Sequence, residues 1–221
     1  MKQRSERKAV ADLYQELGHC GLILGSSGNV SLRAGDSMVI TPSGGAPERV
    51  RARDMVVMTL DGDAPGDATP SSEWPMHAAI YRTTPEAGCI IHTHADACTA
   101  LACLQEPLPA FHYMVLQFGG ATVPCAPYVT FGTPALADYA AEAIQGHSAC
   151  LLANHGMIVH GRDPAQALDR ARLLESLCRQ YLMARAAGTP RLLTQDELVA
   201  ARERFRSYGR RAVEASGDPE R

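Results

Sequence analysis

Lysine is scarce in this chain of 221 residues: only Lys2 and Lys8 occur, and arginine supplies the other 19 basic residues. A Schiff-base enzyme needs a lysine in a buried pocket that lowers the lysine pKa. Both lysines lie in the charged segment MKQRSERK, where we expect them to be solvated. Imine catalysis is therefore not expected. Any carbanion chemistry in this chain needs another electron sink, and a metal ion is the obvious source.

Other features are missing as well. No run of about 18 apolar residues occurs, so we expect no membrane span. The N-terminal segment is too polar for the apolar part of a signal peptide. The net charge of −3 argues against a nucleic-acid surface, which needs a basic excess. The seven cysteines are odd in number and form no CxxC pair, which predicts reduced, buried thiols in a cytoplasmic protein.

The hydrophobic residues that are present predict one domain over residues 1–221. Their periodicity predicts helices over 5–18, 71–82, 95–104, 133–145, 163–187 and 194–211, and strands over 30–33, 37–41, 55–60, 88–93, 111–116, 121–125, 149–153 and 157–160. Ser71 or Ser72 is the expected N-cap of the second helix, and Thr194 with Glu197 predicts a capping box on the last. The class is α/β or α+β, with helices on the faces of a mixed, largely antiparallel sheet. The order of the strands cannot be read from the pattern.

Histidine provides the first candidate site. His92 and His94 stand two residues apart at the end of a predicted buried strand, so their side chains point to the same face. Such a pair alone is more often a surface feature than half of a metal site. His155, in Asn154-His155-Gly156, follows another apolar run and stands where a strand ends. Three imidazoles with open positions are the ligand pattern of a catalytic zinc ion.

Glu73 lies in the first turn of a predicted helix. There it either stabilises the helix dipole or acts as a general base beside the metal, and local sequence does not decide. His77 follows four residues later, and packing or a hydrogen bond to the carboxylate is its expected role. Three clusters of small residues suit a phosphate dianion but are individually ordinary turns. These clusters are Gly28-Asn29, Ser43-Gly44 and Ser71-Ser72.

The ordered segments SSGNVS, ITPSG, SSEW, HTHA, PAFHYMVLQFGGATVPCAPYVTFGT and NHG together resemble the class II aldolase/adducin-head family, and within it the L-fuculose-1-phosphate aldolases. The likeness runs over nearly the whole chain. It implies a three-layer αβα domain that assembles into a homotetramer with active sites at subunit interfaces. It also implies a mobile C-terminal tail over about residues 207–221. Family aldolases often carry TPTG where this chain has TPSG, and serine keeps the hydroxyl group.

The resemblance also implies roles for single residues. His92, His94 and His155 would hold a zinc ion, or another divalent cation such as Mn²⁺ or Co²⁺. Glu73 would be the catalytic acid/base and a possible fourth ligand. Tyr113, contributed by a neighbouring subunit, would be a proton donor. The phosphate and substrate would contact Gly28, Asn29, Ser43, Gly44, Ser71, Ser72 and Tyr208.

The implied reaction is cleavage of a ketose 1-phosphate to dihydroxyacetone phosphate and an aldehyde. The substrate would be L-fuculose 1-phosphate or a 5-deoxyribulose or 5-(methylthio)ribulose 1-phosphate, the last pointing to methionine salvage. Apolar Met114, Leu116 and Phe131 suit a deoxy or thioether end but are equally expected in the core. A methylthioribulose-1-phosphate dehydratase, a pentulose-phosphate 4-epimerase and a non-catalytic adducin-like module remain open. Glu73 favours the aldolase, because related epimerases carry aspartate in that position.

Overall fold

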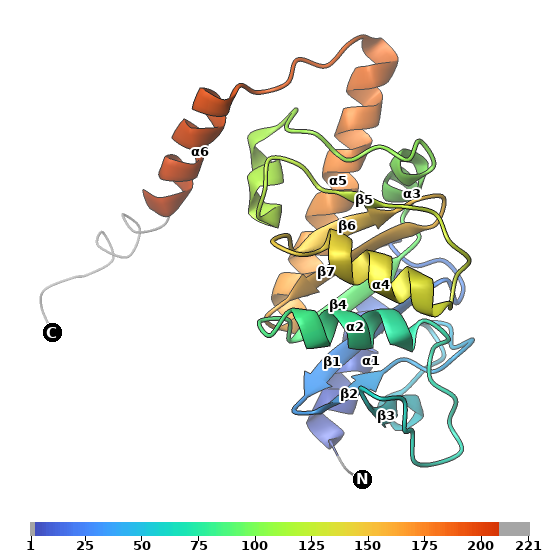
Figure 1. Cartoon of the computed structure of the whole chain (residues 1–221). Coiled ribbons are helices and arrows are strands. Elements are labelled where there is room, and N and C mark those ends of the chain that lie inside the picture. The colour runs from blue at the N-terminus through green and yellow to red at the C-terminus, as the bar shows by residue number, and fades with distance from the viewer. Residues whose placement is uncertain (1–2, 208–221) are drawn as a thin grey trace, which may run out of the picture.

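The computed structural model describes residues 3–207, which form one mixed sheet covered by helices on both faces (Figure 1). The strand order is β3-β2-β1-β4-β7-β6-β5, and every neighbouring pair is antiparallel except the parallel pair β5–β6. The strands are β1 (Gly28–Ala34), β2 (Ser37–Ile40), β3 (Val56–Thr59), β4 (Cys89–Thr93), β5 (Cys125–Ala126), β6 (Ala149–Leu152) and β7 (Gly156–Gly161). The predicted fold class, a largely antiparallel mixed sheet between helices, is confirmed.

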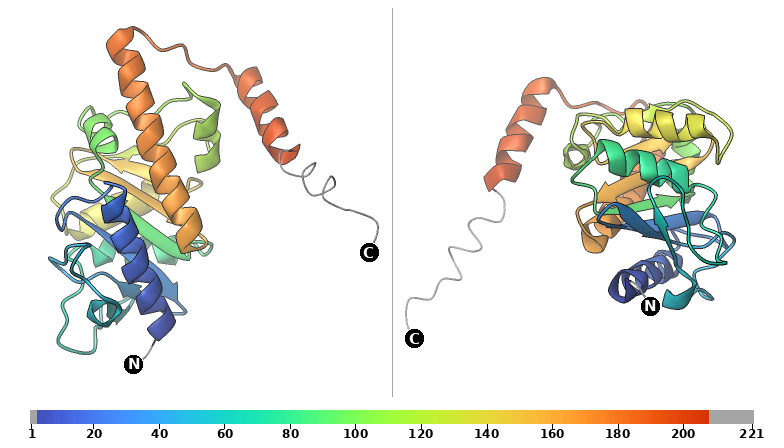
Figure 2. Two further views of the ribbon diagram at one scale, coloured as in Figure 1. Left: turned by 180° about the vertical axis from the view of Figure 1, so that it is seen from behind. Right: turned by 60° about the horizontal axis from the view of Figure 1, so that its bottom comes forward.

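The helices divide between the two faces of the sheet. Helices α2 (Trp74–Thr83) and α4 (Pro134–Ala143) cover the face seen in Figure 1. Helices α1 (Arg4–His19) and α5 (Pro164–Ala187) cover the opposite face, which the rear view in Figure 2 presents. Helix α3 (Asp96–Ala102) belongs to the α1/α5 layer, because its buried residues share that core. Each face therefore has its own apolar core.

Strand periodicity produces the two cores. Along β4, Ile91 enters the core beneath α1 and α5, whereas its neighbour Ile90 enters the core beneath α2 and α4. Along β1, Val30 points to the first core, so Asn29 and Ser31 point to the α2 side. The polar residues of β1 thus face helix α2, a placement on which the site depends.

The last part of the described chain stands away from the layered body (Figure 1). Helix α6 (Gln195–Ser207) packs on the 3₁₀ helix η2 (Tyr113–Phe118), and a second 3₁₀ helix, η1 (Ala52–Asp54), lies near α1. The predicted capping box of α6 is present: Thr194 N–H donates to Glu197 at 2.8 Å, and Glu197 N–H donates back at 3.3 Å. Tyr208 and the predicted tail beyond residue 207 lie outside the described residues.

Several local predictions were wrong, and of the strand expected over 121–125 only Cys125 lies in β5. The strand expected over 111–116 is largely the helix η2, because the His112 ring accepts a hydrogen bond from Met114 N–H and caps a helical turn. Helix α2 begins at Trp74 with Glu73 as N-cap, so neither Ser71 nor Ser72 caps it. Of the cysteines, which are all free thiols, Cys20 and Cys103 are exposed rather than buried. Among residues 3–207, none of the helices combines the length and apolar character needed to cross a bilayer.

Candidate active site

Four of the predicted site residues come together at one edge of the sheet. His92 is in β4, His94 follows that strand, His155 is in the turn between β6 and β7, and Glu73 precedes α2. Their possible ligand atoms all lie within 4.8 Å of one another. His92 Nε2 lies 3.1 Å from His94 Nε2 and 3.2 Å from Glu73 Oε2, and His155 Nε2 lies 3.2 Å from Glu73 Oε1. The distant segments predicted to meet therefore do meet.

The spacing of this cluster fits a small divalent cation. Nitrogen and oxygen ligands at about 2.0–2.1 Å around a tetrahedral zinc ion stand about 3.3 Å apart, close to the three separations of 3.1, 3.2 and 3.2 Å given above. The ring of His92 is also oriented for binding, since its Nδ1–H donates to the Met157 carbonyl at 2.9 Å and leaves the Nε2 lone pair toward its neighbours. Three imidazoles and one carboxylate are a donor set that suits zinc, manganese or cobalt. The residues present therefore fit the metal that the family implies.

The ionisation of the cluster agrees with this use. Burial lowers the pKa of His94 to about 4, helped by the neighbouring charges of His92 and His155. The neutral imidazole, which is the metal-binding form, is therefore favoured. Burial on its own raises the pKa of Glu73, but the charge of His92 and hydrogen bonding with His155 and His92 outweigh it, so the pKa lies below its ordinary value. Glu73 is thus an anion in this pocket.

The turn that carries His155 has strict steric requirements. Asn154 adopts the left-handed conformation, with φ of 52°, and its amide oxygen accepts from Gln105 Nε2 at 2.9 Å. At Gly156, a Cβ atom would stand 2.4 Å from the Thr93 carbonyl oxygen and 3.1 Å from the His94 ring. Glycine is therefore required for β7 to approach β4 closely enough to join the histidines. Asn154 and Gly156, on either side of His155, thus each have a steric explanation.

A pocket of about 320 Å³ opens beside Glu73, His94 and His155. The structure brings all the predicted phosphate residues within residues 3–207 to its wall: Gly28, Asn29, Ser43, Gly44, Ser71 and Ser72. Sequence reasoning missed Ser26, Ser27, Tyr128, Val129 and Asn154, which also line it. Of the three apolar residues considered for substrate contact, Phe131 lines this pocket, whereas Met114 and Leu116 are in η2 and do not.

Tyr14 joins two of the loops around the pocket. Its hydroxyl donates to the Gly45 carbonyl at 2.8 Å and lies 3.3 Å from the Gly28 carbonyl. Burial, with a smaller contribution from Glu48, raises the pKa of Tyr14 to about 12, so the phenol keeps its proton. The loop that leads to Ser71 joins the loop at Ser43, because Ser43 N–H donates to the Thr69 carbonyl at 3.0 Å. No local signal marked Tyr14, because its partners are 14 and 31 residues away.

Tyr113 does not line this pocket. It lies in η2 beside an apolar hollow of about 900 Å³ that Phe111, Met114, Ala201 and Phe205 also line. Its side chain is 48% exposed, and its ring centre is 5.7 Å from that of Phe205. Within one described chain, Tyr113 is therefore separate from Glu73 and the histidines.

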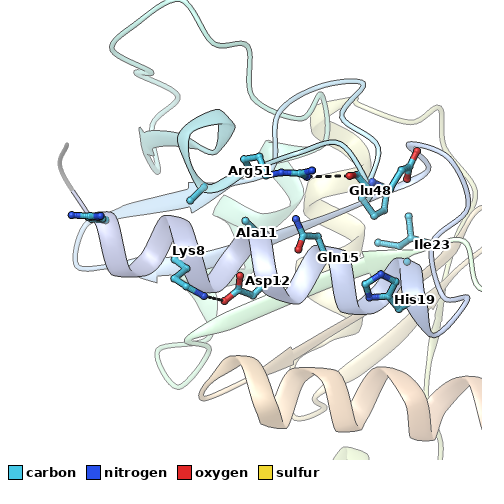
Figure 3. A pocket seen from close by; sticks show the side chains of 12 residues that line it. Lys8, Ala11, Asp12, Gln15, His19, Ile23, Glu48 and Arg51 are labelled. Atoms are coloured by element: carbon cyan, nitrogen blue, oxygen red, sulfur yellow. Dashed lines mark hydrogen bonds and ion pairs between the residues drawn. The ribbon is translucent and has the colours of Figure 1, made fainter.

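Another hollow, of about 710 Å³, lies between α1 and residues 47–52 (Figure 3). None of the predicted site residues lines it. Two of its basic side chains are engaged locally: Lys8 pairs with Asp12, and Arg51 Nη1 donates to the Glu48 carbonyl at 3.0 Å. Because this hollow has neither the histidine cluster nor the serine and glycine loops, the smaller pocket is the candidate active site.

The family model for the class II aldolase and adducin N-terminal domain matches residues 8–182. The chain belongs to this family. It is 41% identical over 203 residues to the 5-methylthioribulose-1-phosphate/5-deoxyribulose-1-phosphate aldolase of Rhodospirillum rubrum, covering 92% of each chain. It is 37% identical to the L-fuculose phosphate aldolase of Escherichia coli strain K12, covering 97% of this chain and 100% of the relative.

The solved structures agree with the sequence relatives. A structure titled L-fuculose 1-phosphate aldolase superposes with a TM-score of 0.88 at 36% identity, covering 93% of this chain and 98% of the other. The predicted family and the predicted enzyme class, a class II aldehyde-lyase, are thereby confirmed. Class II aldolases use a divalent metal, and the cluster of Glu73 with three histidines is a candidate site for one. The roles of the single residues stay predictions.

Proposed function

We propose that this class II aldolase is zinc-dependent and cleaves a ketose 1-phosphate, with a deoxy or thioether end, to dihydroxyacetone phosphate and an aldehyde. The observation that carries the proposal is the shared pocket: a three-histidine and glutamate cluster opens on the same cavity as three loops of serine and glycine. The first group suits a Lewis-acidic metal and the second suits a phosphate group. A ketose 1-phosphate has both groups that such a pocket would bind: oxygen atoms near the breaking bond that a metal can hold, and a phosphate group close by.

The chemistry needs stabilisation of negative charge. Cleavage breaks the C3–C4 bond of the ketose and leaves its electron pair as an enediolate of dihydroxyacetone phosphate. His92, His94 and His155 would hold a divalent metal, which would supply the Lewis acid for that charge. The chain has no lysine within residues 9–221, so an imine is not available as a substitute.

Glu73 is assigned the proton transfer at C3. Its carboxylate is buried to 8% exposure and lies beside both the metal cluster and the phosphate loops. In the addition direction it removes the C3 proton of dihydroxyacetone phosphate, and in cleavage it returns that proton to the enediolate. The loops around Ser43 and Ser71 hold the phosphate group, so that binding energy aligns the breaking bond.

Tyr113 is assigned the proton at the C4 oxygen, and it acts on the pocket of a neighbouring copy. This assignment explains why an exposed tyrosine lies in a separate apolar hollow rather than beside Glu73. It goes together with a homotetramer in which each active site lies between two subunits. A cytoplasmic location, Tyr208 and the mobile tail stay predictions.

The aldehyde half of the substrate faces an apolar part of the pocket wall. Tyr128, Val129 and Phe131 line it, and Tyr128 and Phe131 are 59% and 67% exposed. Such a wall suits a methyl or methylthio group better than a terminal hydroxyl. The relative from R. rubrum is named for methylthioribulose and deoxyribulose phosphates, which supports the same choice. L-Fuculose 1-phosphate, which also ends in a methyl group, is the third candidate.

The decisive experiment measures metal and product together. Purified protein is analysed for bound metal, stripped with a chelator and reloaded separately with Zn²⁺, Mn²⁺ and Co²⁺. Each form is then assayed on the three ketose phosphates with a coupled triose-phosphate reaction. We expect dihydroxyacetone phosphate to appear from at least one substrate, with kcat/KM highest for a deoxy or methylthio pentulose phosphate.

Other products would overturn the proposal in distinct ways. A diketone phosphate from methylthioribulose 1-phosphate would identify a dehydratase, and an epimeric pentulose phosphate would identify a 4-epimerase. A protein that binds metal but turns over none of these substrates would leave the adducin-like binding module.

A further inference from the structure

A continuous chain of buried hydrogen bonds leads from the core to Glu73. Tyr81 Oη lies 2.8 Å from Ser31 Oγ, and Ser31 Oγ lies 2.7 Å from His77 Nδ1. His77 Nε2 lies 2.6 Å from Asn29 Oδ1, and Asn29 Nδ2 donates to Glu73 Oε2 at 2.9 Å. Tyr81, Ser31 and His77 are completely buried, and Asn29 is 3% exposed. We call these four residues the Asn29–Tyr81 ladder.

The ladder follows from the spacing of two elements. Glu73, His77 and Tyr81 recur every four residues on α2 and at its N-cap, about 6 Å apart along a helix. Asn29 and Ser31 are two residues apart on β1, about 6.6 Å along a strand. Because the two repeats nearly match, side chains from the helix and from the strand alternate along the chain of hydrogen bonds. The four-residue spacing was visible in the sequence. Of the two roles expected for His77, burial is present, whereas the hydrogen bond to Glu73 is not direct, because Asn29 stands between them.

The hydrogen bonds have one consistent direction. A carboxylate only accepts, so the Nδ2 group of Asn29 must face Glu73 and its Oδ1 must face His77. His77 then donates from Nε2–H, which leaves Nδ1 to accept the Ser31 hydroxyl proton. Ser31 Oγ in turn accepts from Tyr81. If the Asn29 amide rotated by half a turn, two acceptors would face each other at Glu73 and two donors would face each other at His77, at a cost of buried unpaired groups.

The neutral state of His77 fits this direction. Burial lowers the pKa of His77 to about 3, and the charge of His92 lowers it further while Glu73 opposes the shift. Arg33 also faces the far end of the ladder: its Nη1 donates to the Tyr81 carbonyl at 2.9 Å. The ladder lies beside the apolar core under α2 and α4, where buried polar groups are costly unless fully paired.

We propose that His77 is a positioning residue for the aldol chemistry, acting through Asn29. It fixes the Asn29 amide as a donor to Glu73, and this donor holds one carboxylate oxygen so that the carboxylate keeps the orientation that proton transfer requires. This inference rests on the proposed function. It adds a residue that touches neither metal nor substrate. The competing explanation is a ladder that only stabilises the fold.

The test uses two substitutions at one position. His77→Gln keeps a donor near Nε2 and an acceptor for Ser31, whereas His77→Leu removes both in a similar volume. We expect His77→Leu to lower kcat about 10- to 100-fold, the range typical of residues that orient a reacting group. His77→Gln should recover most of this loss. Bound metal should change little in both variants, since the three histidine ligands are untouched. KM should change less than kcat, since Asn29 is only one of the six predicted phosphate residues on the pocket wall.

A matched control separates positioning from general core damage. His160 on β7 is also buried, at 4% exposure, and lies outside the ladder, where its Nε2 contacts the His147 carbonyl. His160→Leu should keep wild-type kcat. Should His77→Leu prove insoluble, Ser31→Ala cuts the ladder at its next bond and should lower kcat in the same direction by a smaller factor.

A second readout does not depend on activity. Nitrogen-15 NMR of the wild-type protein should show His77 as the Nε2–H tautomer and slow hydrogen exchange at the Asn29 side-chain amide. Exchange should become fast in His77→Leu and stay slow in His77→Gln. Unchanged kcat and unchanged Asn29 exchange in His77→Leu would refute the ladder's role. A wild-type protein that cleaves none of the sugar phosphates would instead refute the proposed function, and the exchange result would still judge the ladder.

Discussion

The two regions assigned to this chemistry are built differently. Around Glu73, the polar side chains are buried and joined to one another across β1, β4, α2 and the β6–β7 turn. Around Tyr113, which is itself exposed, half-buried aromatic and apolar side chains line a hollow between η2 and α6. The first region is complete within one chain. The second has the character of a surface that is buried only against another molecule.

This difference indicates which steps a single chain can carry out and which need a second chain. Under the proposed roles, metal binding and phosphate contact need only the pocket of one chain, because the predicted residues described there lie together. Proton transfer at the aldehyde end needs a second chain if Tyr113 is the donor. Changes in the two regions should therefore have separable effects.

The largest effect should come from removing a metal ligand. His94→Ala deletes one of three imidazoles, and we expect loss of bound metal and a fall in kcat/KM of about 10⁴-fold, because Lewis-acid stabilisation contributes several kcal/mol. Metal analysis and the triose-phosphate assay measure both. His147→Ala, which changes a half-buried histidine outside the cluster, is the control. Full turnover by metal-free His94→Ala would show that the region around Glu73 does not act through a bound metal.

Mixing two inactive variants should sharpen the comparison. We expect Glu73→Gln to lower kcat about 10³-fold and Tyr113→Phe about 10²-fold, both with metal retained. If each site takes Glu73 from one subunit and Tyr113 from its neighbour, co-refolding equal amounts leaves about a quarter of sites unmutated in a cyclic assembly. Activity should then rise above that of either variant alone. With both residues acting from the same chain, every site keeps one substitution and mixing restores nothing.

The buried region should also respond to acid. His77 is held neutral by burial, with a pKa near 3 in the folded chain, whereas the unfolded chain binds the proton below about pH 6.5. The unfolded state therefore gains protons first as the pH falls, and stability falls with it. His77→Gln lacks this titration, so between about pH 7 and pH 5 its stability relative to wild type should improve by about 2 kcal/mol.

Urea unfolding at the two pH values measures this effect. Tyr81→Phe changes the same ladder without removing the histidine. The difference between its free energy of unfolding and that of wild type should therefore be the same at both pH values. If the difference in free energy of unfolding between His77→Gln and wild type is also the same at both pH values, His77 is not the titrating group.

The smallest effect should come from the loops. Tyr14→Phe removes the hydroxyl that joins the Gly28 and Gly45 carbonyls but keeps the buried ring. We expect KM for the sugar phosphate to rise a few-fold, consistent with loss of about one hydrogen bond, while kcat and metal content stay unchanged. Steady-state kinetics measures the split. A fall in kcat with constant KM would place the effect on Glu73 instead.

Much of this arrangement could be predicted from sequence. The alternation of strands and helices predicted the layered fold, and the period of two predicted that His92 and His94 act together. The distance from His155 to that pair could not be read locally, since the β4–β7 pairing that joins them is a tertiary contact. For the same reason, the Asn29–Tyr81 ladder and Tyr14 escaped notice. Helix η2 was mistaken for a strand because its β-branched and aromatic residues carry a strand propensity that a local cap overrides.

The close approach of the chain at Gly156 has a practical consequence for anyone who alters the metal preference of this aldolase. A library that varies position 156 would force the β6–β7 turn away from the Thr93 carbonyl and carry His155 with it. Such variants would lose affinity for every cation rather than exchange one for another. Selection for a new metal should therefore keep glycine at this position and diversify the groups that contact the histidine rings.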